Sequence, residues 1–522
     1  MTGLTIVLLL VALATAVATG ARHWRLPAPS LLVVAGLVAG LAPGVPDIRI
    51  SPQVISVVVL PPLLFASAEE IPWRELRAVW RPVTVLAFGL VLASAAAVGA
   101  VAAAVTPLSP AAAFVLGAVL ASTDPVAVTA LGRRLALPPR IQTMVQAESL
   151  FNDATSLVLF KVAVGTAVTA GAVSAPAAAG QFVLLGGGGA VVGGAVAWLV
   201  TLLRRRTEDP VLETVVALVT PYAAYVLAED LRTSGVTAVV VAGVVLGSTG
   251  HRLGSAPVRL QVHAVYGTVV FLLESVVFAI IGLELPLLIR ELARDERGWP
   301  VWVPLVAGTV VAVRLLWVFP LSALVQQRRG AARVSWRIPA VMSWAGTRGV
   351  MPLAAALSVP LTTDAGEPLP HRPLILMLTT GVVVLTLVVQ GFTLAPVVRR
   401  SGIALEPEHT AREETAARAG LARAALAELE QLADLEAVPE VAVEQARRHL
   451  LARQAEAESA DAAEPAGSWS DAYRDLRRTL IAAESAELQR LYEANRISGT
   501  TRRRLQRTLD LEEAGLGEDG RE

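Results

Sequence analysis

Two aspartates stand in apolar stretches of the chain, where an ionisable side chain is rare. Asp124 lies in the run ASTDPVAVTALGRR, directly before Pro125. Proline lacks a backbone N–H and disfavours the α conformation of the residue before it, so we expect a helix here to open at residues 122–124. An opened helix exposes carbonyls beside the carboxylate, which is how discontinuous membrane helices bind small cations. A simple proline kink with a hydrogen-bonded aspartate is the alternative.

The second aspartate, Asp153, lies in ESLFNDATSLVLFK, where four polar residues fall within two helical turns. Residues four apart share a helix face, so Ser149 and Asp153 form one pair, and Glu148 and Asn152 form another on the adjacent face. Side-chain oxygens suit a hard monovalent cation, and a carboxyl group desolvated among apolar helices favours its protonated form. Asp153 is therefore predicted to bind a cation or a proton, but not both at once.

An arginine occupies a third apolar run, SWAGTRGVMPLAAALSV, where Arg348 lies between Gly346 and Gly349 and Pro352 follows a turn later. The glycines and the proline again indicate a broken helix. Arginine stays charged and needs a partner in apolar surroundings. Glu148 is the predicted partner, because its face of the helix points away from the proposed ion site. Pairing with another acid or with backbone carbonyls is the alternative.

Four further charged residues lie in or near apolar runs: Lys161, Glu274, Glu284 and Arg314. Lys161, the only lysine of the chain, comes two turns after Asp153 and is interpreted as an end residue that extends toward the membrane surface. The other three are predicted to form structural pairs. Contact of Glu274 with the ion path is the less favoured alternative.

The elements that position these residues must be membrane helices. The chain has 522 residues, of which 54% are hydrophobic and 17% charged, and its mean hydropathy is +0.59, which is more apolar than a water-soluble domain requires. Aromatic residues make up 5% and there are 40 glycines, which favours closely packed helices over a membrane barrel. The absence of cysteine excludes disulfides and thiolate metal sites. Nothing in the charge distribution indicates a nucleic-acid partner.

A hydrocarbon core about 30 Å thick requires roughly 20 apolar residues per helix, and the chain contains about thirteen such runs. They lie near residues 4–21, 28–45, 51–70, 82–105, 111–132, 140–171, 179–204, 211–229, 235–248, 264–289, 301–325, 335–359 and 373–397. The first run is predicted to be a membrane helix, not a signal peptide, because its charges, Arg22 and Arg25, follow it.

Arginines fall mainly in alternate loops. The rich loops hold Arg22 and Arg25; Arg74, Arg77 and Arg81; Arg133, Arg134 and Arg140; Arg204, Arg205 and Arg206; Arg252 and Arg259; Arg328, Arg329, Arg333 and Arg337; and Arg399 and Arg400. The other loops hold Arg49, Arg232 and Arg372, and one in which Arg290, Arg294 and Arg297 are offset by acids. Cytoplasmic loops are enriched in Lys and Arg, so we expect the N-terminus outside and the C-terminus in the cytoplasm.

After Arg400 the composition changes to Ala, Glu, Arg and Leu, with apolar residues at helical spacing. We therefore divide the chain into a transmembrane domain, residues 1–402, and a cytoplasmic helical region, residues 403–522. Pro439 is expected to separate two of its helices.

Five motifs in order, LPPLLF, STDP, ESLFND, FAIIGLELP and WAGTRGVMPLAAAL, resemble the first family of monovalent cation:proton antiporters. That family holds the prokaryotic NhaP-type exchangers and the animal Na⁺/H⁺ exchangers, and the resemblance spans about residues 1–400. It implies thirteen helices in two inverted repeats, with unwound spans five and twelve crossing in a core domain. The core would comprise residues 82–171 and 301–397, and residues 4–70 and 211–289 would form a dimerisation domain of a homodimer.

The resemblance also implies roles for the motif residues. Asp153 would bind the cation or the proton, with Asn152 as its neighbour, and Glu148 and Arg348 would form a buried ion pair. The implied Na⁺ ligands are Asp153, Asp124, Ser149 and the backbone oxygen of Thr123. One position departs from the family: relatives commonly carry an acid directly after LPPLLF, where this chain has Ala66, and Glu69 and Glu70 come only at the end of the span.

The predicted function is secondary active exchange of Na⁺ or Li⁺ for H⁺, one for one and electroneutral, by alternating access. This function needs no organic cofactor. The apolar runs contain no His, Cys or Ser–base arrangement of the kind that a membrane enzyme would use. K⁺/H⁺ exchange is the alternative, followed by a channel or sensor on the same fold. The preference for Arg over Lys and the abundance of Ala and Val are typical of a GC-rich bacterium, so we expect a role in pH homeostasis at the inner membrane.

Overall fold

The computed structural model describes most of the chain. The described residues are 3–24, 28–42, 55–71, 73–124, 138–168, 175–207, 209–250, 256–328, 335–362, 366–367, 369–403, 407–435, 439–459 and 467–494, together with short pieces after 495. They form two compact units, Met1–Ala404 and Leu405–Glu522. Pro125 and the loop residues Arg25, Arg49, Arg133, Arg134, Arg252, Arg329 and Arg333 lie outside the described residues.

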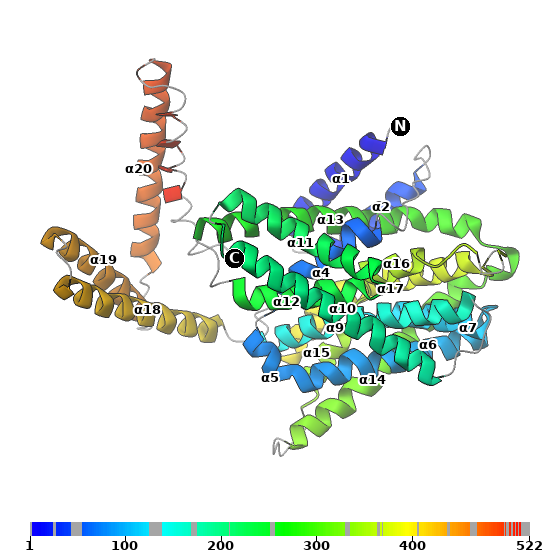
Figure 1. Cartoon of the computed structure of the whole chain (residues 1–522). Coiled ribbons are helices and arrows are strands. Elements are labelled where there is room, and N and C mark those ends of the chain that lie inside the picture. Colours follow the sequence, from blue (N-terminus) through cyan, green and yellow to red (C-terminus); the bar gives the residue numbers. More distant parts are fainter. Residues whose placement is uncertain are drawn as a thin grey trace. The chain divides into compact units, whose positions relative to one another are not determined.

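The first unit is a bundle of helices (Figure 1). Its α-helices are α1 (Gly3–Trp24), α2 (Ala28–Leu41), α4 (Leu60–Glu69), α5 (Trp73–Thr84), α6 (Val91–Val105), α7 (Pro110–Leu120), α9 (Pro139–Val168), α10 (Ala175–Arg204), α11 (Pro210–Asp230), α12 (Gly235–Gly250), α13 (Ala256–Glu291), α14 (Trp299–Arg328), α15 (Arg337–Trp344), α16 (Val350–Leu357) and α17 (Arg372–Ser401). Two π-helical turns, η1 (Ile55–Val59) and η2 (Val85–Leu90), precede α4 and α6, and a 3₁₀ turn, η3 (Arg294–Glu296), precedes α14.

Seven helical stretches in the described part of the chain are long and apolar enough to cross a membrane. They are Trp73–Val105, Ile141–Val168, Pro176–Arg204, Pro210–Asp230, Val258–Glu291, Trp299–Gln327 and Arg372–Ser401. Shorter apolar helices coincide with the other predicted runs, and α15 and α16 together occupy the twelfth. The all-helical membrane fold is confirmed, while the exact number of thirteen spans stays a prediction.

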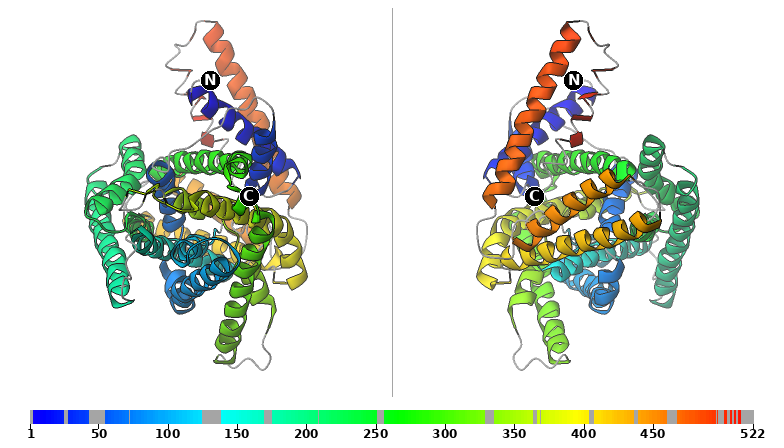
Figure 2. Two further views of the ribbon diagram at one scale, coloured as in Figure 1. Left: turned by 90° about the vertical axis from the view of Figure 1, so that its right-hand side faces the viewer. Right: turned by 90° about the vertical axis from the view of Figure 1, so that its left-hand side faces the viewer.

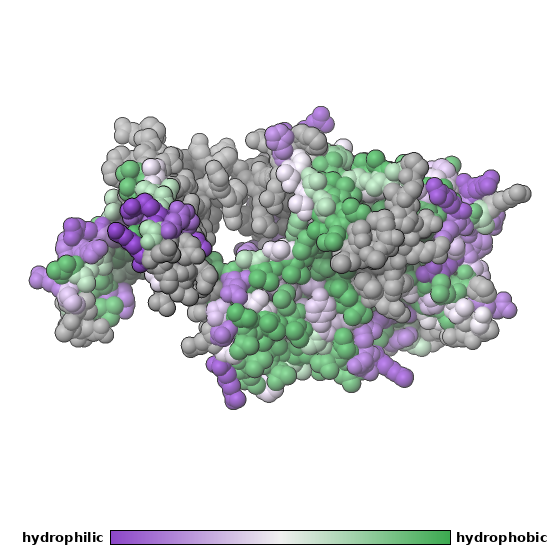
Figure 3. Space-filling view, turned by 90° about the horizontal axis from the view of Figure 1, so that it is seen from above, coloured by the Kyte–Doolittle hydropathy of each residue, from purple (hydrophilic) through white to green (hydrophobic). Residues whose placement is uncertain are grey.

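The surface of the first unit suits a lipid environment. Leu184 of α10 is 68% exposed, Val191 is 73% exposed and Trp198 is 65% exposed, so this helix presents large apolar side chains outward. A space-filling view shows hydrophobic residues over a broad part of one face, with hydrophilic residues mostly along its edges (Figure 3). Such an apolar surface is costly in water and favourable in the hydrocarbon core.

Small residues allow close helix packing inside the bundle. A Cβ atom added at Gly36 of α2 would overlap the carbonyl of Ala279 of α13, and one added at Gly282 of α13 would overlap the carbonyl of Val33. The two backbones therefore approach each other directly, as is common where membrane helices pack through small residues.

The helices of the first unit form two groups by their packing. In the first, which we call the site group, α6, α7, α9, α14, α15, α16 and α17 pack mainly on one another; in the second, the flanking group, α1, α2, η1, α4, α10, α11, α12 and α13 do so. The groups meet where α9 contacts α10, α12 and α4, and where α17 contacts α2 and α13. The transport and dimerisation roles expected for the corresponding ranges, and the homodimer, stay predictions.

The second unit is also helical. It contains α18 (Pro407–Leu435), α19 (Glu440–Ser459) and α20 (Gly467–Glu493), and α18 and α19 pack side by side (Figure 2). The break between them includes Pro439, as the sequence predicts. The cytoplasmic location of this unit stays a prediction.

Candidate ion-binding site

The first helix end at the site leads into Asp124. The helix α7 ends at Leu120, and residues 122–124 are not helical. This is the position at which proline at 125 was expected to open the helix, because the residue before proline avoids the α conformation. The opening beside Asp124 is therefore confirmed.

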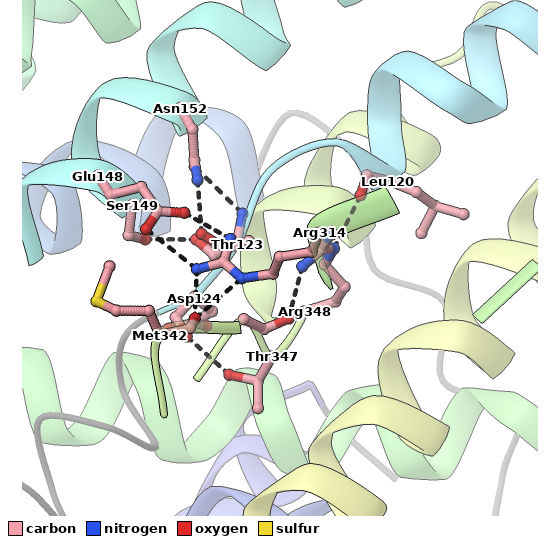
Figure 4. A network of polar contacts seen from close by, with 11 residues as sticks. Leu120, Thr123, Asp124, Glu148, Ser149, Asn152, Arg314, Met342, Thr347 and Arg348 are labelled. Atoms are coloured by element: carbon pink, nitrogen blue, oxygen red, sulfur yellow. Dashed lines mark hydrogen bonds and ion pairs between the residues drawn. The ribbon is translucent and has the colours of Figure 1, made fainter. Parts of the chain in front are cut away.

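A broken helix carries Arg348. Here α15 ends at Trp344 and α16 begins at Val350, with a non-helical segment between them. The two breaks bind each other: the Asp124 N–H donates to the Thr347 carbonyl at 2.8 Å, and the Thr347 hydroxyl donates to the Asp124 carbonyl at 2.7 Å (Figure 4). This reciprocal pairing replaces helical hydrogen bonds that both segments lost. The non-helical segments predicted in spans five and twelve therefore pair with each other, while the crossing of two unwound helices stays a prediction.

Two polar residues of α9 hold the opened segment at Thr123. The Thr123 N–H donates to Asn152 Oδ1 at 3.2 Å, and Asn152 Nδ2 donates to the Thr123 hydroxyl at 2.6 Å. The Ser149 hydroxyl donates to the Thr123 carbonyl (Figure 4). A carbonyl has two lone pairs, so this oxygen can still accept a cation. The structure thus brings Ser149, Asn152 and Thr123 together, as the motifs imply.

Asp153 of α9 lies at the same place. It is 6% exposed, and Asp124, at 8% exposed, is close enough to interact with it electrostatically. Ser122 hydrogen-bonds to the Asp153 carboxyl group. The buried Oδ1 of Asp153, however, has no hydrogen-bond partner among the described residues. A buried carboxylate oxygen without a partner is costly unless a proton or a cation neutralises it. The site therefore has the donor chemistry of a monovalent cation site that competes with protonation.

Gly349 is the reason that Asp124 can lie where it does. A Cβ atom added at Gly349 would overlap the Asp124 carboxylate, so any larger residue must displace that group. Gly349, whose place in the motif indicates a broken helix, thus also makes room for a predicted ligand.

Substituting Gly349 by Ala should shift the Asp124 carboxylate and raise the cation concentration needed for half-maximal exchange. Forcing an extra carbon into a filled site typically costs about 1–3 kcal/mol of folding stability, and a loss of the same size in the interaction with the cation would lower affinity roughly 5- to 150-fold. The control is Gly308→Ala on α14, where an added Cβ meets no atom within 4 Å. Equal apparent affinities of the two variants would show that the position of Asp124 is not important for cation binding.

The expected ion pair between Glu148 and Arg348 is wrong. Arg314 of α14 binds Glu148 through two contacts, Nη1 to Oε1 at 2.5 Å and Nη2 to Oε2 at 3.1 Å, and both side chains are almost fully buried. Arg314 also donates to the Met342 carbonyl through Nε and Nη2. Because α14 packs against α15, the Arg314 guanidinium passes beside Gly346, where a Cβ atom would overlap it.

Arg348 instead binds backbone carbonyls, as the alternative interpretation allowed. Its Nε donates to the Leu120 carbonyl at 2.9 Å and its Nη1 to the Gly346 carbonyl at 2.6 Å. Leu120 is the last residue of α7 and Gly346 follows the end of α15, so both carbonyls lack a helical donor. The Arg348 N–H donates to the Thr386 hydroxyl of α17 at 3.3 Å. Arg348 therefore joins the ends of α7 and α15 and places a positive charge where the two non-helical segments pair.

The other charged residues have separate positions. Lys161 forms an ion pair with Glu229 of α11, away from the paired segments. Arg314 has the structural pair that was expected for it, Glu284 is buried, and Glu274 is half-buried on α13. Ala66 lines a cavity of about 380 Å³ that Glu69 and Glu70 also line. These two glutamates therefore lie in the same cavity as position 66, where relatives commonly have an acidic residue.

Sequence reasoning missed Thr347 and Thr386. Both use their hydroxyls at the second break, and both are fully buried. The motif WAGTRGV contains Thr347, so a polar residue next to the predicted break was a usable signal. For Thr386, which lies in an otherwise ordinary apolar run, the sequence has no such signal.

Residues 6–400 match the family described as sodium/hydrogen exchanger, transmembrane, and this range includes both non-helical segments and α9. The chain belongs to the sodium/hydrogen exchanger family. Relatives include an uncharacterized Na⁺/H⁺ exchanger of Mycobacterium tuberculosis, 36% identical over 98% of this chain and 96% of that protein. The Na⁺/H⁺ antiporter ApNhaP of Aphanothece halophytica is 34% identical over 73% of this chain and 70% of that protein. This exchanger is therefore a multi-pass cation/proton antiporter and belongs to a family of transporters.

The fold of this exchanger is that of a solved antiporter. The sodium proton antiporter MjNhaP1 from Methanocaldococcus jannaschii, at pH 8, matches with a TM-score of 0.63 and 21% identity, over 77% of this chain and 99% of that one. At this identity the likeness concerns the fold, which is the antiporter fold that the motifs imply.

Proposed function

We propose that this exchanger carries Na⁺ or Li⁺ in one direction and H⁺ in the other, with the two ions competing for Asp153. The observation that carries the proposal is the buried Oδ1 of Asp153, which has no hydrogen-bond partner among the described residues. The proposed cation ligands are the carboxylates of Asp153 and Asp124, the Ser149 hydroxyl and the Thr123 carbonyl. Asn152 holds the opened segment in place through Thr123.

The charges around the paired segments support a single monovalent ion. Glu148 and Arg314 neutralise each other in their ion pair. Arg348 then contributes one positive charge against the two carboxylates of Asp124 and Asp153, and all three side chains are buried. With both carboxylates ionised the site has one excess negative charge. Either one Na⁺ or one H⁺ neutralises it, and a buried uncompensated charge is otherwise strongly unfavourable.

Alternating access completes the proposed mechanism. The site group would move relative to the flanking group, so that the site faces one side of the membrane and then the other. We place the arginine-rich end, where α10 ends at Arg204 and α17 carries Arg399 and Arg400, in the cytoplasm by the charge rule. A homodimer in a bacterial inner membrane, with a role in pH homeostasis, is part of this proposal.

K⁺/H⁺ exchange is the second candidate, and one relative favours it. The sodium, potassium, lithium and rubidium/H⁺ antiporter of Bacillus subtilis is 31% identical over 70% of this chain and 56% of that protein. Dequenching of a pH-sensitive dye by Na⁺, Li⁺ and K⁺ in everted vesicles separates the candidates. We expect responses to Na⁺ and Li⁺ that saturate with cation and reverse with the pH gradient. A response to K⁺ alone would contradict the Na⁺ proposal, and a non-saturating response would indicate a channel.

Exchange of one cation for one proton should be insensitive to membrane potential. A potential acts on moved charge, at about 2.3 kcal/mol per elementary charge per 100 mV, and the proposed cycle moves none. In proteoliposomes with fixed Na⁺ and H⁺ gradients, we expect the reversal point to stay constant when valinomycin and K⁺ set the potential. A reversal point that moves with potential would require a second proton carrier, for which the half-buried Glu274 is the next carboxyl group to test.

A further inference from the structure

One ion pair connects the site group to the flanking group. Nζ of Lys161 on α9 lies 2.6 Å and 2.9 Å from the two carboxylate oxygens of Glu229 on α11. The side chains are 37% and 35% exposed, so the pair stands at the edge of the bundle. Glu229 also accepts a hydrogen bond from the Gly235 N–H at 3.0 Å, which fixes the carboxylate at the start of α12.

A second polar contact joins the same two groups. The hydroxyl oxygens of Ser56 in η1 and Ser358, which follows α16, lie 3.1 Å apart. Both serines line a cavity of about 900 Å³, and Glu229 lines the same cavity. The two contacts therefore lie at the same end of the bundle, opposite to the end that carries Arg399 and Arg400 of α17.

Both contacts lie on helices that run from the ion site to this cavity. Lys161 follows Asp153 by eight residues on α9, which is about 12 Å at 1.5 Å per residue. Ser358 follows Gly349, which packs against the Asp124 carboxylate, by nine residues along α16, a similar length. Arg372 of α17 donates to the carbonyls of Val359 and Leu357, so the end of α16 is held to the site group.

We propose that the Lys161–Glu229 ion pair and the Ser56–Ser358 contact form the gate that closes this end of the ion path. This inference rests on the proposed alternating access. Movement of the site group past the flanking group would separate both contacts and open a way from the cavity to Asp153. A part-exposed ion pair and a single hydroxyl contact are weak enough to break in each cycle. In the proposed orientation this end faces the outside.

The cysteine-free sequence permits a direct test with Ser56→Cys/Ser358→Cys. The oxygens replaced lie 3.1 Å apart, so two sulfurs there can close to the disulfide distance of about 2.05 Å with little movement. After oxidation with copper phenanthroline in proteoliposomes, we expect Na⁺-dependent exchange to fall at least tenfold and to return with dithiothreitol. The extent of cross-linking is measured by blocking the remaining thiols with a mass tag.

The matched control is Val303→Cys/Gly381→Cys, which joins α14 and α17 within the site group. A Cβ atom built at Gly381 lies 3.5 Å from Cβ of Val303, within the range of disulfides. Oxidation of this pair should leave exchange within twofold of the reduced protein. Full exchange by the oxidised Ser56/Ser358 variant would refute the gate. If the unsubstituted protein showed no Na⁺-dependent exchange in the same proteoliposome assay, the proposed function, and not the gate alone, would be refuted.

A second measurement does not depend on disulfide formation. Ser122→Cys alone, at a side chain that is 1% exposed and lies beside Asp153, is reached by a membrane-impermeant methanethiosulfonate reagent only through an open path, so its labelling rate from the outer side reports how often the gate is open. Adding Lys161→Met removes the charge that holds Glu229, so we expect labelling to accelerate at least threefold, from the outer side only. An unchanged labelling rate, or equal acceleration from the inner side, would contradict the proposal even if the cross-linked variant failed to fold.

Discussion

Replacing Asp153 by Asn should reduce Na⁺-dependent exchange to background while leaving a folded protein. The amide keeps the shape of the side chain but can neither release a proton nor supply a negative charge for the cation. Because the change also removes a buried carboxylate whose Oδ1 has no hydrogen-bond partner among the described residues, the thermal midpoint should be unchanged or higher. Dye dequenching in proteoliposomes measures exchange, and thermal unfolding in detergent measures the fold.

The matched control is the same chemical change at Asp209. This residue caps α11 by accepting hydrogen bonds from the N–H groups of Val211 and Leu212 at 2.7 Å and 3.1 Å. Asparagine caps helices as well as aspartate does, so Asp209→Asn should exchange at the wild-type rate. Retained Na⁺-dependent exchange in Asp153→Asn would overturn the assignment of Asp153 as the shared carboxyl group.

Glu148→Ala and Arg314→Ala should each lower the free energy of unfolding by about 3–5 kcal/mol, because each leaves a buried charge without its partner. The double substitution removes both charges, so its loss should be much smaller than the sum of the two. Titration with sodium dodecyl sulfate in mixed micelles gives the unfolding free energies for this cycle.

A second cycle, between Glu148 and Arg348, tests the pairing itself. Arg348→Ala should also destabilise, since the carbonyls of Leu120 and Gly346 lose their donor. Its effect should combine with that of Glu148→Ala more nearly additively, because Arg348 makes its hydrogen bonds to carbonyls and not to the carboxylate. A larger coupling energy for Glu148 with Arg348 than with Arg314 would contradict the geometry.

The sequence by itself determined that the protein lies in a membrane, which fold it has and where along the chain the site lies. An apolar composition requires a membrane, and the motifs imply the antiporter fold. Proline at 125 opens the first helix through its own covalent structure, so the break at residues 122–124 is a local property. The four-residue spacing on α9 likewise places Ser149 and Asp153 together, because helix geometry depends only on separation along the chain.

Only the tertiary structure decided which buried groups bind each other. Glu148 could be assigned to a face of α9, but two buried arginines from different helices compete for that face. Arg314 pairs with Glu148 because of how α14 packs beside α9 and α15, and because Gly346 leaves space for the guanidinium. The same is true of Arg348 at the ends of α7 and α15, and of Lys161 opposite Glu229. Such contacts depend on the angles and offsets between helices, which side-chain packing over the whole bundle sets and no local spacing encodes.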